Sequence, residues 1–202
     1  VCLKRTVLLI LLCILTCSGS LYGNPVKVPD PVLEAAIEAK IGDNGAAGTV
    51  DGAWLLGNNG AGGDYKGTPG GLTALGPEGE DLFTLQGVTD LTGLEQAQNL
   101  NTLSLKDSPV SSLLPLQHLK NLNALAFDSC ALNNTHLEEL WKASFSLTAF
   151  ALINISADKD LYNKVDADKL YVLVSRHPAL HRLGLMDLGI DINPANLAGA
   201  PQ

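Results

Sequence analysis

Histidine and cysteine are the residues best suited to metal binding or nucleophilic chemistry. His177 and His181 lie four positions apart, a spacing that places two metal ligands on one face of a helix. Pro178 lies between them and disfavours helical geometry at His177, and no acidic third ligand is close in sequence. Cys130 lies in a leucine-rich stretch, where a small packed side chain fits better than a nucleophile. We therefore predict no metal site and no cofactor.

Carboxylates and glycines show no catalytic pattern. Two aspartate pairs, at 158 and 160 and at 166 and 168, are typical of a solvated face where a helix begins. The glycine-rich stretch lacks the G-x-x-x-x-G-K-[ST] spacing of a phosphate-binding loop, and no G-x-S-x-G nucleophile elbow occurs. We predict a protein that is not an enzyme.

The charge balance makes one class of partner unfavourable. The 202 residues contain 13 Lys and Arg against 21 Asp and Glu, a net charge of -8. A surface that binds phosphate backbones needs clustered basic residues, and no such cluster occurs. We expect no nucleic-acid partner.

The first residues have the order of a secretory signal peptide. Lys4 and Arg5 precede an apolar run of eleven residues, 6–16, and small residues follow at 18–20. The run is shorter than the roughly 20 residues that span a bilayer. We predict a signal peptide over residues 1–20, with cleavage as late as 23, and an exported protein that is secreted, periplasmic or on the cell surface.

Cys17 leaves two interpretations open. It follows the apolar run where a lipoprotein cysteine would stand, with Ser18 and Gly19 after it, but Thr16 before it is a poor match to that signal. Lipidation at Cys17 would give the chain its only expected membrane contact. The alternative is a cysteine that lies in the signal segment by chance. Beyond it only Cys130 remains, so no internal disulfide is expected and packing must stabilise the fold.

A short apolar motif recurs in the second half of the chain. Residues 99–105 (NLNTLSL) match 121–127 (NLNALAF), and the motif returns at 147–152 and 180–185, with spacings of 22, 25 and 33 residues. In L-x-x-L-x-L the last two apolar residues alternate with exposed ones, as in a strand with one buried face. One unit cannot bury that face alone, so neighbouring units must stack. We predict an α/β fold: a leucine-rich-repeat solenoid over 81–202, with parallel strands on the concave face and mixed short helices on the convex face.

Two connecting segments carry helix signals. Thr135 and Glu138 have the S/T-x-x-E spacing of a capping box, which predicts a short helix that begins there. The sequence of residues 166–176 (DADKLYVLVSR) predicts a second helix. This helix must end near His177 because Pro178 follows.

The chain before the repeats divides into a helix and a glycine-rich segment. Asp30 is a good N-cap, Pro31 a good first helical residue, and apolar residues recur every fourth position after it, so we predict a cap helix within 24–42. Residues 42–79 hold 13 of the 20 glycines. We predict a loop over 43–80 that has no helix or strand longer than about one turn and lies outside the core.

Two further expectations concern this glycine-rich segment. Trp54, its largest side chain, suggests an alternative in which the loop is a binding flap with Trp54 as the anchor. Leu82 and Leu85 should mark where regular packing resumes.

These motifs resemble those of a known family. Residues 28–37 (VPDPVLEAAI) resemble the N-terminal cap helix of internalin-type bacterial leucine-rich-repeat proteins, residues 87–95 (GVTDLTGLE) resemble their opening repeat, and residues 99–119 resemble one full 22-residue unit. The last two repeats look more like helical repeats of the ribonuclease-inhibitor kind. The resemblance implies the fold and says little about the ligand. The immunoglobulin-like domain and cell-wall sorting signal of large internalins are missing, so we do not transfer host-cell invasion.

The concave face of the predicted sheet is the expected binding surface, because its side chains are free of core packing. Its middle is small and apolar, which suits a protein partner better than a polysaccharide; the alternative is that alanine is simply tolerated there. The alternative function is a lipid-anchored envelope structural or assembly protein that self-associates through an uncapped C-terminal edge as a homo-oligomer. The predicted partner-binding residues are Thr102, Ser104, Lys106, Ala124, Ala126, Asp128, Ala149, Ala151, Ile153, Arg182 and Met186.

Overall fold

The computed structural model describes residues 25–41, 47–55, 71–76 and 85–193. The predicted signal peptide, Cys17 and Leu82 lie outside the described residues, as does the side chain of Trp54. No helix in the described ranges is long and apolar enough to cross a membrane.

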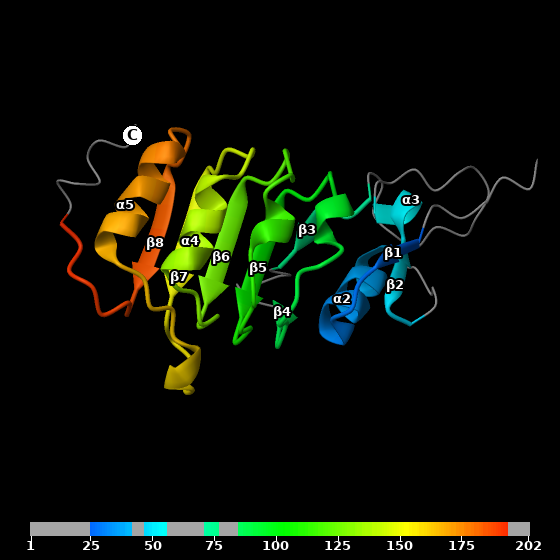
Figure 1. Ribbon diagram of the computed structural model, residues 1–202, viewed down its shortest axis with the longest axis horizontal. Coiled ribbons are helices and arrows are strands. Elements are labelled where there is room, and N and C mark those ends of the chain that lie inside the picture. The colour runs from blue at the N-terminus through cyan, green and yellow to red at the C-terminus, as the bar shows by residue number, and fades with distance from the viewer. Residues whose placement is uncertain (1–24, 42–46, 56–70, 77–84, 194–202) are drawn as a thin grey trace, which may run out of the picture.

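One parallel sheet organises the described chain (Figure 1). Its four longer strands follow one another in chain order, and two short strands pair with the first of them from the other side. The strands are β3 (Ala74–Leu75), β4 (Leu85–Gln86), β5 (Thr102–Lys106), β6 (Ala124–Asp128), β7 (Ala149–Ile153) and β8 (Arg182–Met186). The mixed helix and strand content and the parallel pairing confirm the predicted α/β class.

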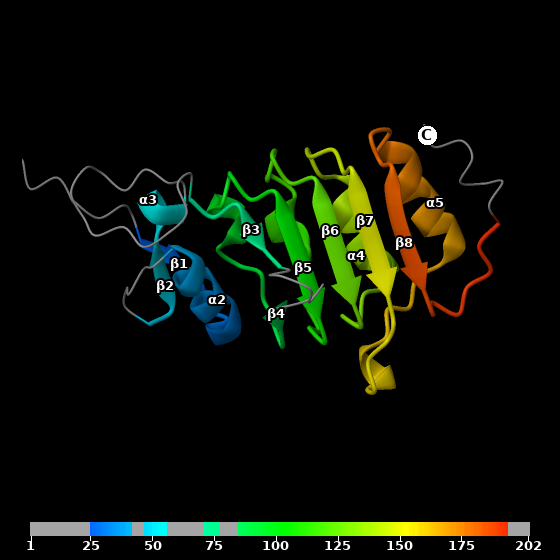
Figure 2. The ribbon, with the colours of Figure 1, turned by 180° about the vertical axis from the view of Figure 1, so that it is seen from behind.

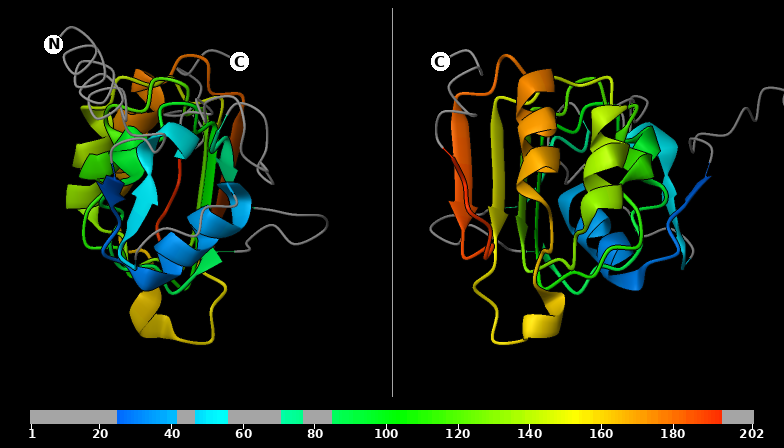
Figure 3. Two further views of the ribbon diagram at one scale, coloured as in Figure 1. Left: turned by 90° about the vertical axis from the view of Figure 1, so that its right-hand side faces the viewer. Right: turned by 60° about the vertical axis from the view of Figure 1, so that its left-hand side comes forward.

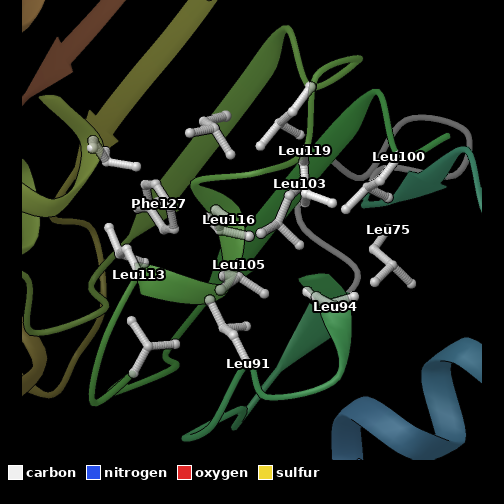
Figure 4. Close-up of a cluster of buried hydrophobic side chains, with 14 of the residues drawn as sticks. Leu75, Leu91, Leu94, Leu100, Leu103, Leu105, Leu113, Leu116, Leu119 and Phe127 are labelled. Carbon is white, nitrogen blue, oxygen red and sulfur yellow. The ribbon is translucent and has the colours of Figure 1, made fainter. Parts of the chain in front are cut away.

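The register of the sheet aligns the repeated motif with itself. Leu103 of β5 is paired with Leu125 of β6, which is paired with Phe150 of β7. Leu105 and Phe127 are paired in the same way two positions further on. These side chains are buried, and Figure 4 shows several of them gathered with leucines of the connecting segments. The stacked motifs therefore share one continuous hydrophobic core, as the repeat predicts.

The connecting helices cover one face of this sheet (Figures 1 and 3). The 22-residue unit leaves room only for short 3-10 turns, whereas the longer later units hold α-helices. Helices α4 and α5 contact each other on this face. The connecting elements are η1 (Leu94–Gln96), η2 (Leu114–Leu116), α4 (Asn134–Trp141), η3 (Lys159–Leu161) and α5 (Ala167–Arg176).

The start of α4 differs from the prediction, whereas the end of α5 agrees with it. Asn133, not Thr135, is the N-cap of α4: its side chain accepts hydrogen bonds from the backbone N–H groups of Thr135 and His136. The His136 ring in turn accepts one from the Asn133 N–H, so histidine takes the place that glutamate has in the expected box. Helix α5 ends at Arg176 with His177 as its C-cap, as predicted.

The N-terminal helix α2 (Pro31–Ile41) forms as predicted and buries one face. Leu33, Ile37 and Ile41 are fully buried in the same core as the repeats. Two short antiparallel strands, β1 (Pro25–Lys27) and β2 (Thr49–Asp51), and a single helical turn α3 (Gly52–Leu55) accompany it. Figure 1 shows this group at the β3–β4 end of the sheet.

Asp30 joins α2 to the first turn of the repeat region. One carboxylate oxygen, Oδ1, accepts the backbone N–H groups of Val32 and Leu33 at 2.9 Å, as an N-cap does. The other, Oδ2, accepts the Thr89 N–H at 2.7 Å and hydroxyl at 2.9 Å, and the Asp90 N–H at 3.1 Å. Burial raises the pKa of Asp30, but the hydrogen bonds together lower it by more, so the pKa of Asp30 is below its ordinary value.

The glycine-rich segment corrects one prediction. Its described helix and strands are no longer than about one turn, as expected. It does not lie outside the core, however, because Val50, Leu55, Leu72 and Leu75 are all buried in the common hydrophobic cluster. Core packing is therefore present from Val50 on; Leu85 begins a short strand, β4, as expected, and Leu82 lies outside the described residues.

The glycine-rich segment contains part of a repeat, which is divided between strands β3 and β4. Leu75 is paired with Leu103 of β5, and Leu85 is paired with Leu105. Strands β3 and β4 thus occupy one strand position between them. In the sequence nine residues separate Leu75 from Leu85, whereas Ser104 alone separates Leu103 from Leu105, so the L-x-x-L-x-L spacing is not visible there.

Candidate functional site

The candidate site is the face of the sheet that no described helix covers, which we call the helix-free face. Figure 2 shows it across β5–β8, with α4 behind the strands. Because side chains alternate along each strand, the strand register places the residues that point to the helix-free face in three rows that run across the strands. Row one is Thr102, Ala124, Ala149 and Arg182; row two is Ser104, Ala126, Ala151 and Gly184; row three is Lys106, Asp128, Ile153 and Met186.

Rows one and two surround a hollow of about 580 Å³. The hollow exists because alanine and glycine contribute almost no side chain there. A Cβ built on Gly184 would lie 3.3 Å from the Cβ of Ala151, so even alanine at 184 would be a tight fit. Eight of the predicted residues line the hollow: Thr102, Ser104, Ala124, Ala126, Ala149, Ala151, Ile153 and Arg182. Lys106, Asp128 and Met186 do not belong to its lining.

Asp128 corrects the prediction of an exposed binding residue, because it is fully buried. Its Oδ1 accepts the Ser129 hydroxyl at 2.8 Å and the Ile155 N–H at 3.0 Å. Its Oδ2 lies 3.9 Å from the Lys106 ammonium. The carboxylate thus holds the chain that leaves β6 and β7. Alternation predicted the face on which it lies, but not the turns that enclose it.

Ser104 is a second correction, since its side chain is only 2% exposed. It lines the hollow, but the chain at Gly76 lies against it: a Cβ built there would be 2.8 Å from the Cβ of Ser104. Gly76 has φ +155°, in the region that favours glycine. Gly76 is the first residue after β3.

The charged residue that lines the hollow, Arg182, lies at one end of it. Arg182, at the end of the hollow formed by β8, is exposed and forms no ion pair with any described residue. His181 precedes it and also lines the hollow, with Nδ1 3.1 Å from the Ala179 carbonyl oxygen. Among the lining residues none is Asp or Glu. The hollow is therefore apolar at its floor and basic at one end.

His181 was missed as a site residue. Leu103, Leu125, Phe150 and Leu183 also border the hollow, but alternation along the strands directs their side chains to the core face of the sheet. The signal for His181 was present in the motif. It stands directly before β8, where Asn123 and Thr148 stand before β6 and β7.

The groups considered for catalysis are dispersed in the structure. Cys130 is buried, with Sγ 3.4 Å from the carbonyl oxygens of Leu105 and Asp128. Burial raises its pKa to about 12, and at neutral pH a thiol so protonated is a poor nucleophile. His177 is buried and accepts the Leu147 N–H, whereas His181 is exposed. No three His, Cys, Asp or Glu side chains of the described residues converge to hold a metal ion.

A second, polar hollow of about 940 Å³ lies where the strands begin. Its amides bind neighbouring repeats: Asn121 Nδ2 donates to the Gln98 carbonyl at 2.9 Å, and Asn101 Nδ2 to the Asn121 carbonyl at 3.4 Å. These side chains connect successive turns of the chain, so we assign them a structural role.

In-register parallel strands that carry L-x-x-L-x-L/F, with helices α4 and α5 on one face of the sheet, are the arrangement of a leucine-rich-repeat fold. No family model and no curated protein matches the sequence. Among solved structures, the chain is similar to internalin C2 from Listeria monocytogenes, with 23% identity over 88% of this chain and 84% of that chain, at a TM-score of 0.41. At these values the match is a likeness of fold and carries no conclusion about function.

Proposed function

We propose that this chain is an exported leucine-rich-repeat protein that binds a protein partner, without catalysis, through the helix-free face as the concave side of a solenoid. The observation that carries the proposal is the apolar hollow of about 580 Å³ in the middle of that face. Its alanines take no part in the core, which lies on the other side of the strands.

The chemistry of the hollow favours a protein over a sugar. Polysaccharide sites need amide and carboxylate groups and exposed aromatic rings, and the described lining contains no Asp, Asn, Trp or Tyr. An apolar hollow instead accepts a bulky apolar side chain, and burial of that side chain contributes roughly 25 cal/mol per Å². A partner whose anchor side chain fills the hollow would place its polar rim over Arg182, Lys106 and Met186.

The sequence adds the rest of the proposal. The signal-peptide pattern over residues 1–20 supports export, and Cys17 leaves lipid anchoring as the alternative to release. The proposed domains are the cap helix within 24–42, the glycine-rich segment and the repeats. We place the start of the repeat region at about residue 71 rather than at 81, because Leu75 of β3 is paired with Leu103 of β5.

Alanine-to-arginine substitutions test the site. Ala126→Arg and Ala151→Arg each place a long charged side chain over the hollow without entering the core, because both positions face away from it. We expect the melting temperature to change by no more than a few degrees. We expect capture of the partner, by crosslinking the tagged protein in its native envelope, to be lost.

Ala157→Arg is the matched control, because it adds the same charge at an exposed loop position away from the hollow. It should retain capture. If Ala126→Arg and Ala151→Arg fold normally and still capture the same partner, the helix-free face is not the binding surface.

A second candidate function is supported by the β8 layer. In β7 the core residues Phe150 and Leu152 are buried, whereas their β8 counterparts Leu183 and Leu185 are only half-buried. Among the described strands, β8 pairs with β7 alone. Such an edge favours stacking on another chain. We propose self-assembly, with lipid anchoring through Cys17, as this alternative.

A further inference from the structure

The two ends of the hollow differ in a way that bears on its occupant. At the β5 end stands Thr102, and at the β8 end stands Arg182. Between them in row one lie only Ala124 and Ala149. Adjacent strands are about 4.8 Å apart, so Thr102 and Arg182 are roughly 14 Å apart along the row. This gap is long enough for one aromatic or branched side chain.

The guanidinium of Arg182 forms no ion pair within the part of the chain that the structure describes. It is exposed, belongs to none of the ion pairs among the described residues, and no acidic side chain lines the hollow. Lys106, which does not line the hollow, lies 3.9 Å from the Asp128 carboxylate. A planar guanidinium binds a carboxylate through two parallel hydrogen bonds, which a lysine does not match. The hollow therefore offers charge complementarity to an acidic ligand at one end only.

We propose that the hollow docks an acidic, apolar peptide segment of the partner protein, with its aromatic or branched side chain on the alanine floor and a neighbouring carboxylate on Arg182. This inference rests on the proposed function and specifies the partner's chemistry. Gly184 sets the geometry, because it leaves the floor beside Arg182 without a side chain. A carboxylate one or two residues from the apolar anchor reaches the guanidinium from there.

The test measures binding of the full chain to three fluorescent octapeptides that are identical in their Gly and Ser flanks. The first has Glu two residues before Phe, the second replaces Glu by Lys, and the third replaces Phe by Gly. By fluorescence polarisation we expect the first to bind about tenfold more tightly than either of the others, since a hydrogen-bonded charge pair and a buried aromatic side chain are each worth at least that factor.

Arg182→Glu should reverse the preference, so that the Lys peptide binds more tightly than the Glu peptide. Lys159→Glu is the matched control, since it makes the same charge change at an exposed position outside the hollow. It should leave the order of affinities unchanged. Dodecanoate is included as a competitor, because a free fatty acid also combines an apolar body with a carboxylate.

Equal binding of the Glu and Lys peptides, no binding of any peptide, or binding of dodecanoate alone would each overturn the inference. The same variants distinguish failure of this inference from failure of the proposed function. If Ala151→Arg abolishes partner capture and Arg182→Glu does not, the face binds a protein by other chemistry, and only the acidic segment is wrong.

Discussion

At the scale of single residues, His177 is a buried titratable group packed against an aromatic ring. Its ring stacks on Phe145 with centroids 5.8 Å apart, and Nδ1 accepts the Leu147 N–H at 3.3 Å. Nε2 is buried and has no hydrogen-bond partner. Burial lowers the pKa of His177 below its ordinary value of 6.5, and the charge of Arg176 lowers it further.

This environment predicts acid-sensitive stability. Because the folded pKa is depressed, the unfolded chain takes up a proton first as the pH falls below 6.5. The contribution of His177 to stability is therefore complete at neutral pH and is lost as the pH falls toward the folded pKa. Urea unfolding at pH 7.5 and 5.0 should show a lower midpoint at pH 5.0, and His177→Gln should reduce the difference.

His118, which is exposed, provides the control. His118→Gln should show the same pH dependence as the wild type. A midpoint difference that His177→Gln leaves unchanged would mean that other groups cause the acid sensitivity.

At the scale of elements, the interrupted repeat changes what the glycine-rich segment contributes. The Leu72 N–H donates to the Leu55 carbonyl at 3.0 Å, so Leu55 and Leu72 are joined within the core. Replacing residues 45–78 by a short linker would remove four core side chains. A loop outside the core would tolerate this replacement, whereas the burial of these four side chains predicts a large loss of stability, measured as a lower midpoint of urea unfolding.

Leu75→Ala tests this assignment most directly. Leu75 is buried and paired with Leu103, so its truncation leaves a cavity in the first layer and should lower the free energy of unfolding by about 3 kcal/mol. Leu114, which is 51% exposed, is the control, and Leu114→Ala should cost less than about 1 kcal/mol. Equal effects of the two in urea unfolding would contradict the assignment of Leu75 to the core.

At the scale of the whole molecule, each layer of the fold is stabilised by contacts with the layers next to it. Asp30 connects helix α2 to Thr89, and each strand then covers the apolar residues of the one before it. In such an arrangement the interfaces between neighbouring layers carry much of the stability. The half-buried Leu183 and Leu185 of β8 are where this succession is least complete among the described strands.

The self-assembly alternative makes a prediction at this scale. If the β8 layer stacks on a second copy, light scattering after size exclusion should show a mass that rises with concentration. Ile190→Glu, at a half-buried position in this layer, should restore the monomer, whereas Val172→Glu on the outer side of α5 should not. A monomeric mass at all concentrations would exclude this candidate.

The sequence by itself determined the repeat, the register of four strands, the end of α5 and most of the hollow's lining. These follow from local periodicity, because the alternation in L-x-x-L-x-L decides which side chains share a face whatever the partners are. The tertiary structure alone decided that Leu75 and Leu85 occupy one strand position, that turns enclose Asp128, and that Arg182, with no ion pair among the described residues, lies beside the alanines of the hollow. Each of these depends on residues far apart in the chain that come into contact only when the layers stack.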